Sequence, residues 1–280
     1  MKVLPSLIKY LVLVLWIGFT LFPIVWMFLT SFKTPLDVFA NPPVLISIPP
    51  CIENWIKLFS PGTKWEGPRI LHRYLPNSMI ASTSSVAITI PTSILAAYAI
   101  SRFRFKGRRI VAIMILATRM LPPVATTIPL YIFFAGLGML DTLIALILVY
   151  SALSVPLATW MLIAYLDEVP REIEEAAQID GASLKDTLFR VVIPIIAPGI
   201  AATSIFTFLL AWNDFAIAFF LTKEVAKTLP VHAPVFVTEV AIEWGAMSAF
   251  GTFYIIPALF FSVFFSRYLI KGLTLGAVKV

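Results

Sequence analysis

The sequence predicts an all-α membrane protein with six transmembrane helices and both termini in the cytoplasm. Three observations carry this prediction: the apolar composition, six long apolar runs, and the distribution of Lys and Arg between them. Of the 280 residues, 60% are hydrophobic and 13% are charged, whereas soluble domains carry about 25% charged residues. So few charged residues cannot cover a water-soluble fold of this size, and this excludes the soluble classes of protein.

Six apolar runs are long enough to cross about 30 Å of hydrocarbon as helices. The first run follows Lys2 and Lys9 and is longer than the core of a signal peptide, so we expect it to remain uncleaved. The second is rich in Ser and Thr and is the weakest of the six by hydropathy. The predicted spans are residues 7–32, 79–100, 110–134, 143–166, 199–221 and 250–270.

The orientation of these spans follows from two short loops. Loop 101–109 holds five basic residues and no acidic residue, whereas loop 135–142 holds no basic residue. Basic loops remain in the cytoplasm, so loop 101–109 is predicted inside and loop 135–142 outside. Residues 33–77 and 222–249 are then extracytoplasmic, and we expect residues 33–77 to form an irregular external cap.

The charged residues, the cysteine and the histidines disfavour two other functions, nucleic-acid binding and metal binding. The net charge of +6 follows the membrane topology instead of forming one basic patch, so no nucleic acid is expected as a partner. Cys51 is the only cysteine and cannot form an internal disulfide. His72 and His232 lie far apart in predicted loops, where we expect them to be solvated and not metal ligands.

The longest cytoplasmic loop, residues 167–198, differs in composition from the rest of the chain. Pro170 suits the first turn of a helix, with glutamates close behind it near the positive helix end. Gly181 is the residue type that ends a helix in the left-handed conformation. Ser183 and Asp186 then resemble a capping box that opens a second helix. From these residues alone, the loop is either a solvated linker or an element that docks on another protein.

The spacing within this loop resembles the EAA loop of ABC importer permeases. Glu175-Ala176-Ala177 is followed after three residues by Gly181, and after nine more by Val191, Ile193 and Pro194. Only the aliphatic positions depart from the family pattern, with Val191 in place of Ile and Ile193 in place of Leu. Further matching pieces extend along nearly the whole chain, to sugar-importer permeases of the MalG type. They are Ser31-Phe32-Lys33, Asn77-Ser78, Arg102-Phe103-Arg104-Phe105-Lys106-Gly107, Trp212-Asn213-Asp214-Phe215 and the tail 272–279.

This resemblance implies one transmembrane permease domain over residues 1–280, with type I ABC importer architecture. It implies a carbohydrate or polyol-type solute and a bacterial or archaeal cytoplasmic membrane. The implied partners are a second, different permease subunit, two ATPase subunits that bind ATP and Mg, and an extracytoplasmic solute-binding protein. No cofactor is implied in this chain. The loop 167–198 would dock on an ATPase through Glu175, Ala176, Ala177, Asp180 and Gly181.

Polar residues inside the predicted spans are candidates for the solute path. Arg119 lies in the third span, where an unpaired guanidinium costs at least about 2.5–3.5 kcal/mol, so it should face a partner or water. Asn213 and Asp214 lie in the fifth span. These residues belong either to a polar translocation path or to a structural pair or subunit interface. The aromatic rings of Trp160 and Trp212 suit either sugar stacking or packing.

Two alternatives to an ATP-driven importer remain at this point. A secondary transporter or channel should carry several acidic residues within its spans for ion coupling, and Asp214 alone is thin support. A membrane enzyme needs paired carboxylates, a His/Cys cluster or a nucleophile with its base, and none is visible. No Gly precedes Lys-Ser or Lys-Thr, so the chain has no Walker A loop and is not predicted to be an enzyme itself.

Overall fold

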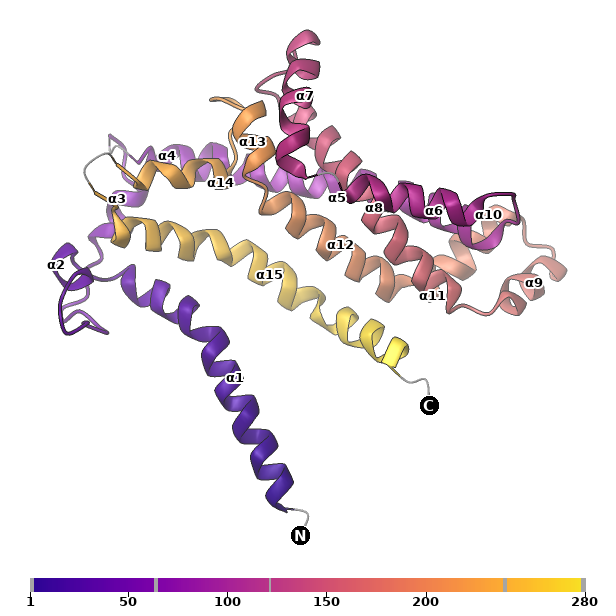
Figure 1. Ribbon diagram of the computed structural model, residues 1–280, viewed down its shortest axis with the longest axis horizontal. Helices are drawn as coiled ribbons and strands as arrows, with labels where there is room; N and C mark the ends of the chain where they lie inside the picture. Colours follow the sequence, from indigo (N-terminus) through magenta and orange to yellow (C-terminus); the bar gives the residue numbers. More distant parts are fainter. Residues whose placement is uncertain (1–2, 63–64, 121, 239–240, 278–280) are drawn as a thin grey trace. The chain divides into compact units, whose positions relative to one another are not determined.

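A computed structural model describes residues 3–62, 65–120, 122–238 and 241–277 (Figure 1). Over these ranges the chain is helical and contains no strand beyond an isolated antiparallel bridge between Val237 and Ile242. The prediction of an all-α protein is therefore confirmed. The α-helices are α1 Val3–Thr30, α2 Pro35–Val38, α3 Glu53–Phe59, α4 Gly67–Arg69, α5 Leu75–Arg102, α6 Arg108–Ala117, α7 Pro123–Gly136, α8 Leu143–Asp167, α9 Arg171–Ile179, α10 Leu184–Asp186, α11 Ile193–Ile195, α12 Ala197–Trp212, α13 Ala216–Leu221, α14 Leu229–His232 and α15 Trp244–Ala277.

The described helices supply four spans that are long and apolar enough to cross a membrane, and up to six if each bent pair counts as one span. The four are Lys9–Thr30, Gly67–Arg102, Leu143–Asp167 and Trp244–Phe264. The bent pairs are Arg108–Met120 with Ala125–Gly136, at 91°, and Leu184–Ile195 with Ala197–Trp212, at 76°. This count agrees with the six predicted spans, but the second bent pair begins at Leu184, inside the predicted loop 167–198, and ends at Trp212.

The third predicted span, residues 110–134, is not one continuous helix. The chain forms α6, a 3₁₀ turn at Thr118–Met120 and then α7, which begins at Pro123. Two successive prolines, Pro122 and Pro123, account for the break. Neither can donate a backbone hydrogen bond, and a proline also disfavours helical geometry at the residue before it.

The fifth predicted span, residues 199–221, is also interrupted. Helix α12 ends at Trp212, and the short helix α13 begins at Ala216. The Asp214 carboxylate accepts a hydrogen bond from the Ala218 N–H at 3.0 Å, which stabilises the start of the new helix. A short polar residue therefore ends one helix and starts the next.

The described chain divides into two compact units, residues 1–72 with 232–257 and residues 73–231 with 258–280. In the first unit the Asn54 side chain donates to the carbonyls of Ser31 and Lys33, both at 3.0 Å, and so ties α3 to the end of α1. His232 is fully buried, with its Nε2 3.0 Å from the Trp65 carbonyl. The expectation of a solvated loop histidine is therefore wrong for His232, because it lies in α14 and packs edge-on against Phe236 and Phe250.

The second unit is built on the pair of helices α5 and α8, which pack against each other more extensively than any other described helices. Small side chains allow this close approach, as in many membrane helix pairs. The Ser93 hydroxyl also donates across the interface to the Val155 carbonyl at 3.4 Å. The Ser and Thr content that weakens the hydropathy of residues 79–100 thus serves packing. The buried small residues of α5 are Ser78, Ala81, Ser82, Ser85, Thr89, Ser93, Ala97 and Ser101.

Two hydrophobic clusters lie along this helix pair, one toward each end. The first joins the beginning of α5 and α8 to α7, α12 and α13, through residues such as Ala81, Leu146 and Leu221. The second joins the later halves of α5 and α8 to loop 167–198, through residues such as Leu162 and Leu188. Both ends of the α5–α8 pair are therefore held in apolar packing with the segments that follow them.

Candidate functional site

The first short helix of loop 167–198 begins and ends as its sequence predicts. Helix α9 starts at Arg171, directly after Pro170. It ends in a left-handed Gly181 with φ of +90°. The Gly181 N–H donates to the Gln178 carbonyl at 3.0 Å and the Ala182 N–H to the Ala177 carbonyl at 2.9 Å. These two bonds form a Schellman motif, which confirms the predicted glycine elbow.

The second helical segment of the loop opens with the predicted Ser183 cap, although only one of the two hydrogen bonds of a capping box is formed. The Ser183 Oγ accepts from the Asp186 N–H at 3.1 Å and donates to the Asp186 carboxylate at 2.5 Å. The helix then continues through a π-helical stretch, Thr187–Val192, into α11.

The outward side of this elbow carries the residues predicted to dock on a partner. Glu175, Ala176, Asp180 and Gly181 are exposed, and Ala177 is half-buried. Large apolar side chains stand exposed beside them: Ile173, Ile179, Leu184 and Phe189, with Ile179 86% exposed. Grouped exposed apolar side chains mark sites that meet a protein or a membrane, so this side of the elbow is an interaction surface.

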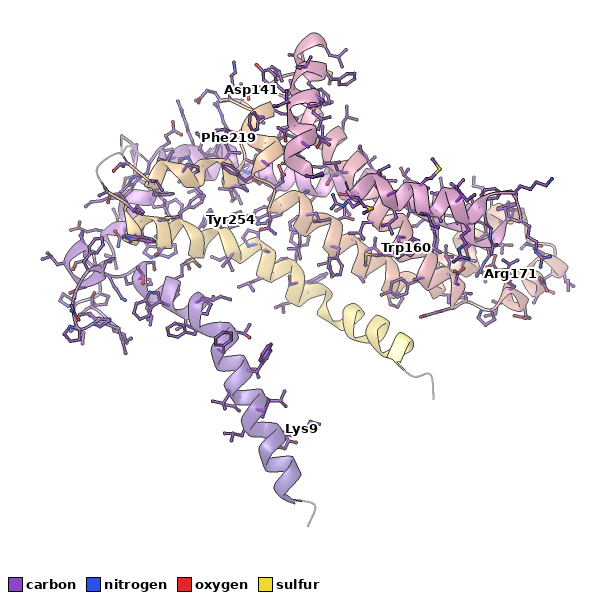
Figure 2. All side chains as sticks on the ribbon, viewed as in Figure 1. Lys9, Asp141, Trp160, Arg171, Phe219 and Tyr254 are labelled. Atoms are coloured by element: carbon purple, nitrogen blue, oxygen red, sulfur yellow. The ribbon has the colours of Figure 1, made fainter. Side chains whose placement is uncertain are left out.

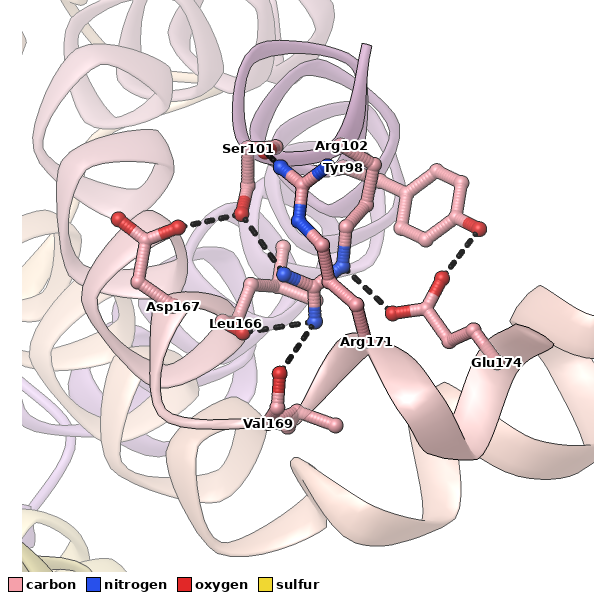
Figure 3. Close-up of polar contacts among 8 residues, drawn as sticks. All are labelled: Tyr98, Ser101, Arg102, Leu166, Asp167, Val169, Arg171 and Glu174. Atoms are coloured by element: carbon pink, nitrogen blue, oxygen red, sulfur yellow. Dashed lines mark hydrogen bonds and ion pairs between the residues drawn. The ribbon is translucent and has the colours of Figure 1, made fainter. Parts of the chain in front are cut away.

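The inward side of α9 is held by a buried ion pair. The Arg102 Nε donates to the Glu174 carboxylate at 2.5 Å, and the two side chains are only 9% and 7% exposed (Figure 3). The other Glu174 oxygen accepts from the Tyr98 hydroxyl at 2.8 Å. Glu174 thus connects α9 to the end of α5.

The same arginine also binds the end of α8. Its Nη2 donates to the carbonyls of Leu166 at 2.8 Å and Val169 at 3.0 Å, where the helix presents its negative end. Arg171 returns a hydrogen bond to the Ser101 carbonyl at 2.8 Å, and the Ser101 hydroxyl donates to the Asp167 carboxylate. Because loops 101–109 and 167–198 are predicted to lie in the cytoplasm, we call this network the cytoplasmic clamp. It consists of Tyr98, Ser101, Arg102, Leu166, Asp167, Val169, Arg171 and Glu174.

The clamp is not evident from the sequence. The sequence pattern places Arg102 in the basic loop and Glu174 near the positive end of its own helix. The two residues lie 72 positions apart, and no local spacing connects them. The small residues of α5 and α8 could have indicated the clamp. They allow the two helices to approach closely, and this also brings the ends of the helices together.

The predicted path residues Arg119 and Asp214 are brought together by the fold. Both line a cavity of about 130 Å³, together with Tyr150 and Ser154. Arg119 also lines a neighbouring cavity of about 430 Å³ with Thr118 and Thr126. The guanidinium therefore faces hollow space within the second unit, which agrees with the cost of exposing it to lipid.

The other predicted path residues take different positions. The Asp214 carboxylate accepts from the Tyr150 hydroxyl at 3.0 Å in addition to the Ala218 N–H. Asn213 is exposed, and its side chain donates back to the Leu209 carbonyl. Trp212 is 0% exposed and stacks on Phe208, which is a packing position. Trp160 lies on α8 with an exposed ring (Figure 2).

Within the described ranges, no three His, Cys, Asp or Glu side chains gather as metal ligands. What the arrangement offers is mechanical and electrostatic. It combines an exposed elbow, a buried clamp behind it, and a polar cavity between α8, α12 and the break in the third span.

Residues 89–275 match the protein family described as "Binding-protein-dependent transport system inner membrane component". Three curated relatives illustrate the similarity. The sulfoquinovosyl glycerol transport system permease protein SmoH of Agrobacterium fabrum is 35% identical over 92% of this chain and 89% of its own length. The trehalose/maltose transport system permease protein MalG of Thermococcus litoralis is 35% identical over 92% and 91%. The diacetylchitobiose uptake system permease protein DasC of Streptomyces coelicolor is 32% identical over 95% and 94%.

A solved structure shares the fold. It is a chain in the crystal structure of a bacterial ABC transporter involved in the import of the acidic polysaccharide alginate. The match has a TM-score of 0.72 at 20% identity and covers 95% of this chain and 96% of that chain. At this level of identity the likeness concerns the fold.

Proposed function

This chain belongs to the family of binding-protein-dependent transport system inner membrane components. We propose that it transports a carbohydrate, and that an ATPase subunit binds its elbow and displaces it during ATP hydrolysis. The chain is an integral membrane permease subunit of a binding-protein-dependent importer, and its relatives are permease subunits of transporters. The proposal adds the solute, the partners and the residues that couple them.

The proposed solute is a carbohydrate of glycoside or oligosaccharide size. The names of three relatives support this proposal, since they specify sulfoquinovosyl glycerol, trehalose or maltose, and diacetylchitobiose. In this chain the proposed path includes the cavity lined by Arg119 and Asp214. A second permease subunit would complete the path.

The proposed assembly contains a second, different permease, two ATPase subunits that bind ATP and Mg, and an extracytoplasmic solute-binding protein. It would lie in a bacterial or archaeal cytoplasmic membrane. A structural neighbour, an alginate ABC transporter solved in complex with an alginate pentasaccharide-bound periplasmic protein, supports the binding-protein partner.

The two faces of α9 carry the proposal for coupling. Glu174 and Glu175 are adjacent in sequence and therefore point about 100° apart around the helix. Glu174 is buried against Arg102, whereas Glu175 is exposed on the side of the elbow. A nine-residue helix that is anchored on one face and exposed on the other is suited to transmit a partner's displacement to α5 and α8.

The test uses the elbow glycine. A Cβ atom at Gly181 would meet no atom within 4 Å, so a substitution acts through the backbone conformation alone. Gly181→Val places a β-branched residue at φ of +90°, at a cost of about 1–3 kcal/mol. We expect normal membrane insertion, loss of ATP-dependent uptake and weaker co-purification of the ATPase. Glu175→Lys, which reverses an exposed charge, should have the same effect to a lesser degree.

Gly181→Asn is the matched control, because Asn tolerates the left-handed conformation and should retain uptake. Uptake at the wild-type level by both Gly181→Val and Glu175→Lys would refute the coupling role of the elbow. Uptake driven by an ion gradient without ATP would refute the ATP-driven importer itself.

A further inference from the structure

The extracytoplasmic segment 223–226 is bound by one carboxylate. Asp141 lies between α7 and α8, and its oxygens accept four successive backbone N–H groups. The donors are Lys223 at 2.9 Å, Glu224 at 3.1 Å, Val225 at 3.0 Å and Ala226 at 2.9 Å. Figure 2 labels Asp141 beside the segment that follows α13. A carboxylate enclosed by backbone N–H groups makes strong, charge-assisted hydrogen bonds.

The backbone at Asp141 is shaped for this contact. Its φ is +57°, a conformation that Asp and Asn tolerate better than other side chains. Its own N–H donates to the Leu221 carbonyl at 2.8 Å, at the end of α13. The next residue, Thr142, caps α8 by accepting from the Ala145 N–H at 3.3 Å. Asp141 thus joins the end of α13 and the segment after it to the first turn of α8.

Helix α5 holds the same segment from a second direction. The Asn77 side chain donates to the carbonyls of Val225 at 2.8 Å and Lys227 at 2.9 Å. The Ser78 hydroxyl accepts from the Leu229 N–H at 2.8 Å. We call Asp141, Asn77 and Ser78 with segment 223–229 the extracytoplasmic clamp. Its bonds reach only the main chain of the segment, and the side chains of residues 223–225 stay exposed.

The two clamps lie at opposite ends of the same two helices. Asn77 and Arg102 lie near the two ends of α5, and Asp141 and Asp167 mark the two ends of α8. These helices have 28 and 25 residues, so each is roughly 40 Å long. The two helices pack extensively against each other, which favours a stiff pair.

We propose that Asp141 is a positioning residue that fixes segment 223–226 to α8, so that α5 and α8 carry displacements between this segment and the elbow at Gly181. This proposal rests on the proposed function, in which a loaded binding protein meets the extracytoplasmic side and an ATPase meets the elbow. Through Asp141, a displacement caused by the loaded binding protein on the outer side is transmitted to the cytoplasmic clamp.

The test compares Asp141→Asn with wild type in the complex purified from membranes with its partner subunits. Asn keeps the tolerance for positive φ but replaces one accepting oxygen with an NH₂ group, so the change acts on the clamp alone. We expect amide exchange over residues 223–226 to rise about tenfold. ATP hydrolysis without binding protein should persist, while its stimulation by loaded binding protein should fall by about fivefold or more.

Glu53→Gln is the control. It removes an exposed carboxylate from α3, outside the clamp, and should leave both exchange and stimulation unchanged. Unchanged exchange in Asp141→Asn would overturn the clamp, and faster exchange with full stimulation would overturn its role in signalling. A wild-type complex without any stimulation would refute the proposed function instead. If Asp141→Asn does not assemble, Asn77→Ala, which removes the side-chain hydrogen bonds to the Val225 and Lys227 carbonyls, is judged by the same two outcomes.

Discussion

The cytoplasmic and extracytoplasmic clamps hold the two ends of the α5–α8 pair by different chemistry. In the cytoplasmic clamp, Arg102 and Glu174 are oppositely charged side chains, and both are buried. In the extracytoplasmic clamp, the half-buried Asp141 binds the main chain of another segment. The first clamp therefore depends on two matched side chains, whereas Asp141, Asn77 and Ser78 of the second each bind main-chain groups.

This difference has consequences for what each end can do. A buried ion pair adds little net stability, but each partner leaves an uncompensated charge when the other is removed. The cytoplasmic clamp therefore enforces one position for α9. The carboxylate of Asp141 binds only main-chain groups of residues 223–226, and the side chains of residues 223–225 remain exposed on the surface. The cytoplasmic end is built for rigidity, and the outer end combines a fixed backbone with a variable surface.

We expect the two clamps to lie on opposite sides of the membrane, and labelling tests this as an all-or-none outcome. In a Cys51→Ser background, Leu137→Cys reports on the turn beside Asp141 and Arg104→Cys on the loop after Arg102. Both positions are exposed, and neither is a glycine of positive φ. An impermeant external thiol reagent should label Leu137→Cys and not Arg104→Cys, because basic loops remain inside. External labelling of Arg104→Cys would mean that the two clamps do not lie on opposite sides of the membrane.

Removing one partner of the ion pair should have the largest effect on stability. Arg102→Met leaves Glu174 buried with only the Tyr98 hydroxyl as its partner in the clamp, which costs about 3–5 kcal/mol. We expect a lower melting temperature of the purified complex and loss of uptake. Arg104→Met, which removes an exposed arginine two positions along, should change neither. Equal stability of the two variants would mean that the clamp does not hold α9.

The features that the sequence predicts correctly are local. Gly181 ends α9, and Ser183 with Asp186 opens the next helix, because caps depend on residues within three or four positions. The helical class and the number of spans follow from hydropathy over windows of about 20 residues. Each of these signals is contained within the element that it describes.

The features that the sequence does not reveal depend on contacts between distant segments. Glu174 has the same appearance as Glu175 in the sequence, and only the position of Arg102 makes one buried and the other exposed. His232 is buried in a contact with the Trp65 carbonyl, which lies 167 positions away in the sequence. Asp141 carries no signature, since the groups that it binds are backbone N–H groups, which every residue type except proline has.

The last prediction concerns pH and has the smallest expected effect. Burial raises the pKa of Asp141, but the four backbone N–H donors outweigh it and hold the pKa below the ordinary value of 3.8. Because the pKa of Asp141 is lower in the folded than in the unfolded chain, the stabilising free energy from its hydrogen bonds is fully present above pH 3.8. It is lost as the pH falls through the lower, folded-state pKa. Protection of the amides of residues 223–226, corrected for the intrinsic exchange rate, should therefore stay constant from about pH 8 to 5.

Below about pH 4 the protection should fall in wild type, whereas in Asp141→Asn it should remain low and flat, because that side chain does not titrate. The charged neighbours of the cradle are Lys223 and Glu224 on the segment itself and Arg73, whose guanidinium donates to the Glu224 carbonyl at 3.3 Å. Protection that changed between pH 8 and 5 in wild type and in Asp141→Asn alike would assign the dependence to a group other than Asp141. The charge of Asp141 would then not be what holds the segment, and the contrast with the Arg102–Glu174 ion pair would be lost.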